Sequence, residues 1–398
     1  MLVACNNKLA QSHIKETKAM KEFITHVGID TDSRGFDIAL AEGFGSENKE
    51  VRSWGRIAAT MEAVDKLIKK LRKMGHRRLR FVYEAGPCGY GLYRHLKARG
   101  EDCIVVAPSR IPQKPGERVK TNRRDACKLA RLDRAGELEA VYVPDEADEA
   151  MRDLSRGRKC AVEAATRVKQ QIKSLLLRQG IQYRGAGESW GSAYRQWVGQ
   201  LQLPHAAQTY VLSEALVALE ECEQRVQRLT ERIRELLPSW RLQPVVAALQ
   251  GLRGVAMITA VEMIAEVGDL TRFKNPRELM AYLGLVPTED SSGEKRRLGS
   301  ITKAGNRNAR RSLVEAAWAY ARRPQVSRAL RQRQQGLSQE VREISWRAQV
   351  RLCGRYRKLS ARGKQKHKII VAIARELSAF MWAIAMSLSS EKQSAPAT

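Results

Sequence analysis

The sequence lacks any arrangement of cysteines that would hold a metal ion or a disulfide framework. Its seven cysteines are scattered, their number is odd, and no two form a C-x-x-C pair. The six histidines are equally dispersed. A zinc ribbon and a small disulfide-rich secreted fold are therefore excluded, and reduced thiols in a cytoplasm are expected.

Long uninterrupted apolar runs are also missing. Residues 1–22 are polar and show no apolar core before a small-residue cleavage site, so we expect no secretory signal and treat residues 1–23 as a leader. The most apolar stretch, Ile369 to Leu388, is interrupted by Arg375 and Glu376. This pattern is typical of a buried amphipathic helix rather than a membrane span, and it predicts a soluble, cytoplasmic protein with no membrane partner.

Acidic residues are few beside the basic ones. The sequence has 43 Asp and Glu residues and 71 Lys and Arg residues, which gives a formal net charge of +28. A chain this basic usually binds a polyanion, most commonly nucleic acid; a ribosome-associated or merely basic protein is the alternative. With 43% hydrophobic residues, the 398-residue chain is expected to form two or three globular domains.

The first third of the chain alternates between strand and helix patterns. Strands are predicted at 24–30, 36–40, 79–83 and 103–107, and helices at 57–74 and 92–99. The first two strands are joined by a short polar turn, which predicts a hairpin. We therefore expect an α/β domain over residues 24–148.

The rest of the chain is expected to be helical. Apolar residues at helical spacing from Val168 to Leu175 and from Leu212 to Leu236 predict two long helices over residues 149–245. These helices could form an antiparallel, coiled-coil-like arm or belong to an ordinary helical subdomain. Short helices and loops are expected over 246–335, and basic helices over 336–398.

Three acidic residues stand at the ends of predicted elements in the first domain. Asp30 ends the first strand, Glu84 follows the third strand, and Asp125 opens a helix. Carboxylates on separate strand ends and a helix can converge on one or two Mg²⁺ ions, which stabilise the oxygens of a reacting phosphodiester. A turn or helix-capping role is the alternative for each. Three other acids are expected to be surface residues: Asp32, Asp37 and Asp133.

A serine pair lies in a basic loop of the second half. Ser291 and Ser292 are followed by Lys295, Arg296 and Arg297. A serine attacks a phosphodiester well only when its proton is removed and the developing charge is neutralised, and the neighbouring cations supply the second requirement. On the residues alone, such a loop is more often a simple turn.

These motifs resemble those of a known family. Ile29-Asp30, Tyr83-Glu84-Ala-Gly-Pro and Lys120-Thr-Asn-Arg-Arg-Asp125-Ala are similar to the amino-terminal domain of the IS110/IS1111 transposases, and the Ser-Ser-Gly segment to their carboxy-terminal domain. The resemblance implies a RuvC-like (RNase H-like) fold with a DEDD tetrad, followed by a mostly helical transposase domain. It also implies an enzyme that cuts and rejoins DNA.

The resemblance assigns roles to individual residues. It implies that Asp30, Glu84 and Asp125 bind Mg²⁺ or Mn²⁺ and that Ser291 is the nucleophile, with Ser292 not fully excluded. The third acid of the tetrad is replaced here by Asn122. An amide oxygen can still bind a metal ion but brings no negative charge, which should weaken Mg²⁺ affinity.

The resemblance also implies partners. A noncoding RNA encoded by the element would guide recognition by pairing with DNA, and a dimer or tetramer near the nucleoid of a prokaryotic cell is expected. Asn306 and Arg310 fit helix capping and a solvated basic face. The cations expected to hold phosphate are Lys295, Arg296, Arg297, Lys303 and Arg311.

The segment from Arg342 to Lys368 interleaves many cations with Trp346 and Tyr356. Base stacking on the aromatics and phosphate pairing by the cations would suit nucleic acid, and apolar anchoring of the aromatics is the alternative.

Two rival functions stay open at this point. A metal-dependent junction-resolving nuclease would use water and leave Ser291 idle. A nucleic-acid-binding relative of a transposase would be inactivated by Asn122. No P-loop sequence is present, which agrees with transesterification because that reaction needs no ATP.

Overall fold

The computed structural model describes residues 24–43, 50–113, 121–185, 190–291 and 297–394. The chain divides into two compact units, Met1–Val143 and Pro144–Thr398. The expected leader, residues 1–23, lies outside the described residues.

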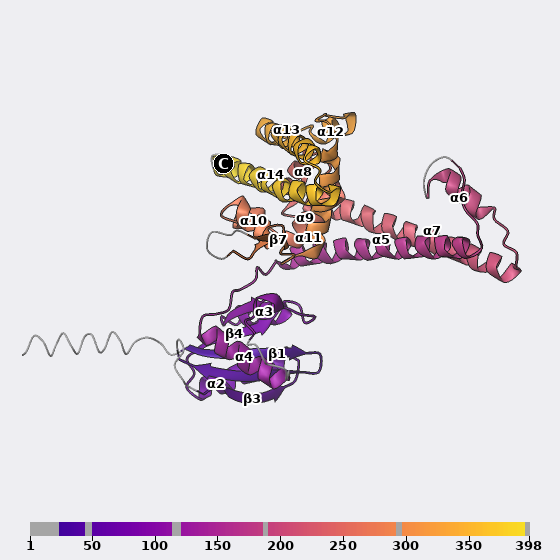
Figure 1. Ribbon diagram of the computed structural model, residues 1–398. Helices are drawn as coiled ribbons and strands as arrows, with labels where there is room; N and C mark the ends of the chain where they lie inside the picture. The colour runs from indigo at the N-terminus through magenta and orange to yellow at the C-terminus, as the bar shows by residue number, and fades with distance from the viewer. Residues whose placement is uncertain (1–23, 44–49, 114–120, 186–189, 292–296, 395–398) are drawn as a thin grey trace, which may run out of the picture. The chain divides into compact units, whose positions relative to one another are not determined.

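The first unit is a five-stranded mixed sheet with helices on its faces (Figure 1). The strands are β1 (Ile24–Asp32), β2 (Gly35–Glu42), β3 (Arg52–Ile57), β4 (Arg78–Glu84) and β5 (Asp102–Val106). Their order is β3-β2-β1-β4-β5; β2 is antiparallel to both its neighbours, and β1, β4 and β5 run parallel. The helices are α2 (Met61–Lys73), α3 (Gly91–Ala98), η1 (Pro108–Arg110) and α4 (Asn122–Arg134). The predicted α/β class is confirmed for this unit.

The sequence pattern missed β3. Residues 57–74 were expected to form one helix, but α2 begins at Met61 and the chain before it forms the edge strand β3. This strand has no buried position, so the alternation of apolar and polar residues that marks a half-buried strand is absent.

The two faces of the sheet are packed differently. One face buries Val27, Ile29 and Phe81 with the apolar residues of α2 and α3. The other face carries α4, which approaches β1 closely because position 28 is a glycine. A Cβ on Gly28 would collide with the carbonyl oxygen of Ala126 and lie 2.6 Å from the backbone nitrogen of Ala130.

The second unit is almost entirely helical within its described residues. The arm contains α5 (Glu146–Arg178), α6 (Ser192–Gly199) and α7 (Ala206–Leu236). The body contains η2 (Leu237–Ser239), α8 (Gln243–Leu249), α9 (Met257–Val267), η3 (Leu270–Arg272), α10 (Pro276–Tyr282), β6 (Pro287–Glu289), β7 (Leu298–Ile301), α11 (Arg307–Ala317), η4 (Trp318–Ala321), α12 (Arg328–Arg333), α13 (Gln339–Ala361) and α14 (Lys366–Ser394).

The helices α5 and α7 form an antiparallel hairpin, one of the two expected arrangements (Figure 1). Trp240, just beyond α7, donates to Asp148 near the start of α5 at 2.7 Å. Towards the other end of the hairpin, Lys169 pairs with Glu223 at 2.8 Å. Contacts that pair the start of one helix with the end of the other establish the antiparallel orientation.

The last helix, α14, lies in the core of the second unit. It packs on α8, α10, α11 and α13 and buries Ile373, Leu377 and Met381. Its segment Lys366–Ser390 is long and apolar enough to cross a membrane, with 56% of the most apolar window buried inside the protein. The burial agrees with the expected amphipathic core helix.

Candidate active site

The carboxylates predicted in the first unit belong to the face of the sheet covered by α4. Successive strand residues point to opposite faces, so Asp30 shares a face with Gly28, which contacts α4 at Ala126 and Ala130. Earlier on the same strand, His26 contacts Asp133 at the other end of α4. The strand and helix therefore run in opposite directions, and Asp30 belongs with the first turn of α4.

The same alternation places Glu84. On β4, Arg80 donates to Asp133 at 3.1 Å, and Val82 packs with Leu129 one helical turn earlier. Glu84 is the next residue on this face, which aligns it with Asp125, one further turn towards the start of α4. In the parallel register of β1 and β4, Ile29 is opposite Tyr83, so Asp30 and Glu84 are neighbours at the carboxyl ends of two adjacent strands.

Glu84 and Asp125 are half-buried, and neither side chain makes a hydrogen bond or ion pair within the described part of the chain. Asp32 and Asp37 differ, because both accept from Arg56, at 2.8 and 3.3 Å. The Arg56 guanidinium lowers the pKa of Asp32 below its usual value.

The expectation that Asp133 is a surface residue was wrong. Its side chain is buried, 2.6 Å from Nδ1 of His26 and 3.1 Å from Nε of Arg80. A buried carboxylate needs such partners to offset its desolvation. Both partners are distant in sequence, so no local pattern could reveal the burial.

Asn122 is the first residue of α4 but does not cap it. The cap is Thr121, whose hydroxyl accepts from the backbone nitrogen of Arg124 at 3.3 Å. Asn122 is exposed and lies one turn before Asp125, on the same side of the helix.

Whether these residues fit a metal ion depends on their donor atoms. Asp30, Glu84 and Asp125 offer oxygen ligands, which hard divalent cations prefer, and Gly28 brings α4 close enough to β1 to share a site. Among the residues that the structure describes, no group of three or more His, Cys, Asp or Glu stands close enough to hold a metal ion as they lie. The donor chemistry and the shared face fit such an ion.

In the second unit, Ser291 follows β6 in a small hairpin rather than a featureless loop. The backbone nitrogen of Asp290 donates to the carbonyl oxygen of Arg297 at 3.0 Å and closes the hairpin next to the serine. Ser291 is exposed, and its hydroxyl donates to Oε1 of Glu289 at 3.0 Å. The nucleophile candidate therefore has a carboxylate acceptor that the sequence analysis did not identify.

Close backbone packing fixes the base of this hairpin. Gly284 and Gly305 have φ of +63° and +73°, and a Cβ on either would collide with a backbone carbonyl, of Ala304 and Tyr282 respectively. Arg310 donates to the carbonyl oxygens of Leu283 and Ala304, at 2.9 and 3.1 Å, and so joins the two segments.

The predicted phosphate-binding cations are placed differently from one another. Arg297 and Lys303 are exposed at the hairpin. Arg311 is exposed too, but it pairs with Glu163 of α5 at 3.2 Å. Three residues named from the sequence lie outside the described residues: Ser292, Lys295 and Arg296.

Asn306 has the helix-capping role expected from the sequence. Its side chain accepts from the backbone nitrogens of Asn308 and Ala309 at the start of α11, at 2.9 and 3.1 Å. Its amide also donates to the buried carboxylate of Glu266 at 2.7 Å.

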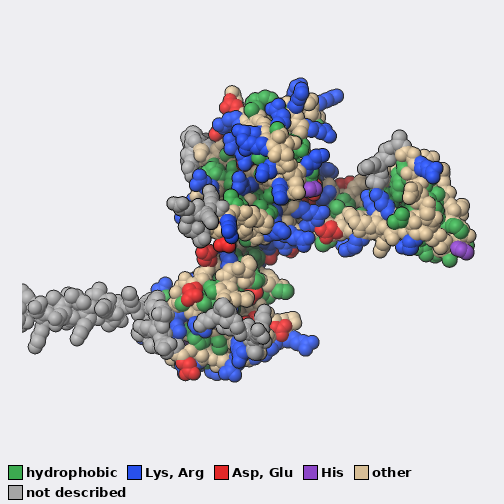
Figure 2. All heavy atoms as spheres, in the orientation of Figure 1, with side chains coloured by type: hydrophobic (Ala, Val, Ile, Leu, Met, Phe, Trp, Pro, Cys, Tyr) green, Lys and Arg blue, Asp and Glu red, His purple; other side chains and the backbone are tan. Residues whose placement is uncertain are grey.

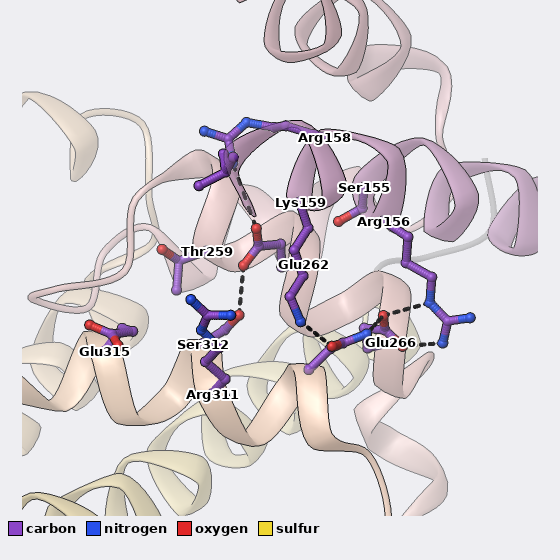
Figure 3. Close-up of a pocket in the computed structure, with 12 residues that line it drawn as sticks. Ser155, Arg156, Arg158, Lys159, Thr259, Glu262, Glu266, Arg311, Ser312 and Glu315 are labelled. Atoms are coloured by element: carbon purple, nitrogen blue, oxygen red, sulfur yellow. Dashed lines mark hydrogen bonds and ion pairs between the residues drawn. The ribbon is translucent and has the colours of Figure 1, made fainter. Parts of the chain in front are cut away.

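Glu266 belongs to a charged cavity between α5, α9 and α11, drawn in Figure 3. Arg156 of α5 donates to both carboxylate oxygens of Glu266, at 2.8 and 2.7 Å, and Asn308 donates at 2.8 Å. Burial would raise the pKa of Glu266, but the hydrogen bonds from Arg156, Asn306 and Asn308 outweigh it and lower the pKa. This network ties the arm to the helix that follows the serine hairpin, and the sequence gave no local signal for it.

Comparison with known proteins agrees with both halves of this arrangement. Residues 27–180 match the sequence profile of the DEDD transposases of the IS110 type, and residues 246–332 match that of the Transposase IS116/IS110/IS902 family. The chain is 49% identical to y4qE of Sinorhizobium fredii, which is named as a transposase, over 90% of this chain and 88% of that protein. The chain belongs to the IS110 family of transposases.

More distant members show the same relationship. The transposase for insertion sequence element IS1533 of Leptospira borgpetersenii is 28% identical over 85% of this chain and 98% of its own length. The transposase for IS1111A of Coxiella burnetii is 26% identical over 58% of this chain and 62% of its own.

Membership of the IS110 family makes this chain a DNA transposase. Asp30, Glu84 and Asp125 lie within the residues of this chain that match the DEDD profile, and domains of this type indicate dependence on a divalent metal ion. The serine hairpin, Lys303 and Arg311 lie within the residues that match the second profile. Both α13 and α14 lie beyond the matched residues.

Proposed function

We propose that this transposase joins its Ser291 to DNA and then transfers the linked strand to a new partner. In the first step a bond forms between Oγ of Ser291 and a backbone phosphorus, and one phosphorus–oxygen bond of the strand breaks. Ser291 loses a proton and the departing strand end gains one. The phosphodiester energy is retained in the protein–DNA bond, so rejoining needs no cofactor such as ATP.

The observation that carries this proposal is the hydrogen bond from Ser291 to Glu289, at 3.0 Å. A serine needs a base to become a good nucleophile, and the carboxylate of Glu289 is in position to receive its proton. Arg297 lies across the hairpin and is exposed, where a guanidinium can neutralise charge on the phosphate. Lys303 and Arg311, together with Lys295 and Arg296, are proposed to hold the DNA backbone.

We further propose that the first unit is a RuvC-like, RNase H-like domain. The support is its strand order β3-β2-β1-β4-β5, with an antiparallel β2 and α4 crossing β1. Asp30, Glu84 and Asp125 would hold Mg²⁺ or Mn²⁺, with the amide oxygen of Asn122 as a further ligand. When bound, the ion would supply positive charge that stabilises the phosphate oxygens of a DNA strand during cleavage.

Three further proposals are based on membership of the IS110 family and not on the geometry of the site. We propose that an element-encoded noncoding RNA guides the choice of DNA, that the active protein is a homo-oligomer (a dimer or tetramer), and that it acts in the cytoplasm at the nucleoid. The proposed domain limits are 24–148, 149–245, 246–335 and 336–398.

A covalent adduct between protein and DNA tests the proposal. Labelled DNA carrying an element end would be incubated with the protein and divalent metal, denatured, and analysed for label that migrates with the protein. We expect an adduct with wild type, none with Ser291→Ala, and a normal adduct with Ser292→Ala. Cleavage without an adduct would identify a hydrolytic nuclease, loss only in Ser292→Ala would move the nucleophile to the neighbouring serine, and no cleavage at all would indicate an inactive binding protein.

A further inference from the structure

The carboxy-terminal helices carry a long segment without acidic residues. From Ile344 to Arg375 the chain contains ten Arg and Lys residues and no Asp or Glu. Within the described part of the chain, Glu376 alone forms ion pairs with these cations, through Arg351 at 2.8 Å and Arg355 at 2.6 Å. Most of the remaining cations are exposed, and none of them pairs with a carboxylate within the described residues, which creates a strong local attraction for polyanions.

The outer face of α13 combines these cations with apolar side chains. Its inner face buries Val341, Ile344 and Leu352 in the core. One helical turn apart on the opposite face, Trp346 is 46% exposed and Val350 is 50% exposed. Four exposed cations share this face or its borders, Arg342, Arg347, Arg357 and Lys358, and two exposed carboxylates, Glu340 and Glu343, lie at its amino-terminal end.

The two aromatic residues of this segment have different roles. Tyr356 is half-buried and packs against the core, so it has the anchoring role that was one of the alternatives. Trp346 does not belong to the core. A second exposed tryptophan, Trp318 in η4, is 38% exposed and meets the ring of His367 edge-on at 5.9 Å, at the start of α14.

Figure 2 shows Lys and Arg side chains gathered over the part of the second unit where Figure 1 labels α12, α13 and α14. An exposed indole surrounded by cations suits a strand whose bases are unpaired, because one face of each base is then free to stack on the ring. In a duplex the bases are already stacked on one another, and only the phosphates could meet this surface.

We propose that the outer face of α13, centred on Trp346, binds a single strand of nucleic acid. A base stacks on Trp346, and Arg347, Arg357 and Lys358 pair with the phosphates on either side. The proposal rests on the family's action on nucleic acid and does not depend on the serine chemistry. Single-stranded RNA and single-stranded DNA share the chemistry in question, and the test separates them.

Binding would be measured on the full-length Ser291→Ala protein in the presence of chelator, so that no cleavage interferes. The probes are an unstructured labelled RNA, the DNA strand of the same sequence, and the corresponding duplex, all followed by fluorescence anisotropy. We expect Trp346→Ala to weaken single-strand binding about tenfold, as the loss of one stacked base would, and to leave duplex binding unchanged. Trp346→Phe should retain most of the affinity.

A matched control is Tyr210→Ala, which removes an aromatic side chain that is 67% exposed on α7. It should leave binding of all three probes unchanged. A larger loss on RNA than on DNA, or the reverse, identifies the natural strand, and an equal loss supports the face as a general single-strand site. No loss with Trp346→Ala, or an equal loss on the duplex, would overturn the proposal.

Salt dependence tests the cations separately. The pair Arg347→Ala and Lys358→Ala should reduce the slope of log affinity against log salt by about 1.4, since each phosphate contact on a single strand contributes about 0.7. The pair Arg225→Ala and Arg228→Ala removes the same charge from exposed positions on α7 and should leave the slope unchanged. Equal slopes in all three proteins would overturn the proposed phosphate contacts. Failure to form a serine adduct would not affect either result.

Discussion

The hydroxyl of Ser291 donates a hydrogen bond to Oε1 of Glu289 at 3.0 Å, within a hairpin whose base is fixed by close backbone packing. The two residues are held in register because Glu289 pairs with Leu298 across the hairpin and Asp290 bonds to Arg297 one step further. A serine two residues beyond a carboxylate is common in sequences. The strand pairing fixes the backbone on which these two side chains meet, as the proposed roles of nucleophile and base require.

The first prediction is that Glu289→Gln slows adduct formation by about a hundredfold or more, the usual contribution of a general base. Glutamine can still accept the hydrogen bond but cannot take the proton. The rate of adduct formation under single-turnover conditions measures the effect. Asp290→Asn removes the same charge from the next residue, also exposed, and should react nearly normally. Equal rates for the two variants would show that local charge, not proton transfer, is responsible.

Part of this site could be predicted from the sequence. Asp30 and Glu84 follow apolar strand patterns; in the structure Glu84 is the last residue of β4, and Asp30 lies two residues before the end of β1. Glu289 was missed because β6 and β7 are only three and four residues long and mostly exposed, so no alternation of apolar and polar residues marks them. Glu266 was missed because its partners come from α5 and α11, which sequence spacing cannot bring together.

The second prediction concerns the carboxylates. Asp30→Ala, Glu84→Ala and Asp125→Ala should each lower the cleavage rate on the order of a thousandfold, since each removes an oxygen ligand and its charge from the proposed metal site. Wild-type cleavage should stop in excess chelator and return with Mg²⁺ or Mn²⁺. A matched control is Asp32→Ala, because Asp32 is paired with Arg56 instead. Full wild-type activity in chelator would exclude a metal site.

The third prediction tests the close approach of α4 to β1. Gly28→Ala should destabilise the first unit by about 1 to 3 kcal/mol, the usual cost of overpacking, because its Cβ would strike backbone atoms of α4. It should also reduce cleavage by displacing Asp125 from Asp30. In Gly157→Ala, on α5, the new Cβ meets nothing within 4 Å, and stability should be unchanged or slightly higher. The free energies of unfolding of the two variants are compared with that of wild type by circular dichroism. If Gly28→Ala is as stable and as active as wild type, α4 can move away from β1 without cost.

The fourth prediction is a pH dependence at the base of the arm. The pKa of Glu266 is lowered in the folded protein, so the ionised carboxylate stabilises the fold at pH values above its unfolded pKa. This contribution is lost as the pH falls through the folded pKa. The melting temperature of Glu266→Gln should therefore lie below that of wild type at pH 7, and the gap should narrow on acidification. If the difference in melting temperature stays constant with pH, the charge of Glu266 is not the cause of the lower stability of the variant.

The last prediction concerns Asn122, where the chain departs from the acid tetrad of its family. An asparagine at this end of a helix is often a cap, but the residue that caps α4 is Thr121, so Asn122 does not have that role. Because Asn122 lies one turn before Asp125, an aspartate there would add a negative ligand beside the proposed metal site, and hard cations bind more tightly as ligand charge increases. Asn122→Asp should therefore lower the Mg²⁺ concentration for half-maximal cleavage and leave DNA affinity in chelator nearly unchanged.

An aspartate in the first turn of α4 also interacts favourably with the helix dipole and stabilises the helix by about 0.3 to 1 kcal/mol, so the stability of the variant is measured as well. Arg123→Gln lowers the charge of the same helical turn by the same one unit, at the next, exposed position, and controls for that effect. If both variants shift the Mg²⁺ midpoint equally, or neither does, Asn122 is not a ligand.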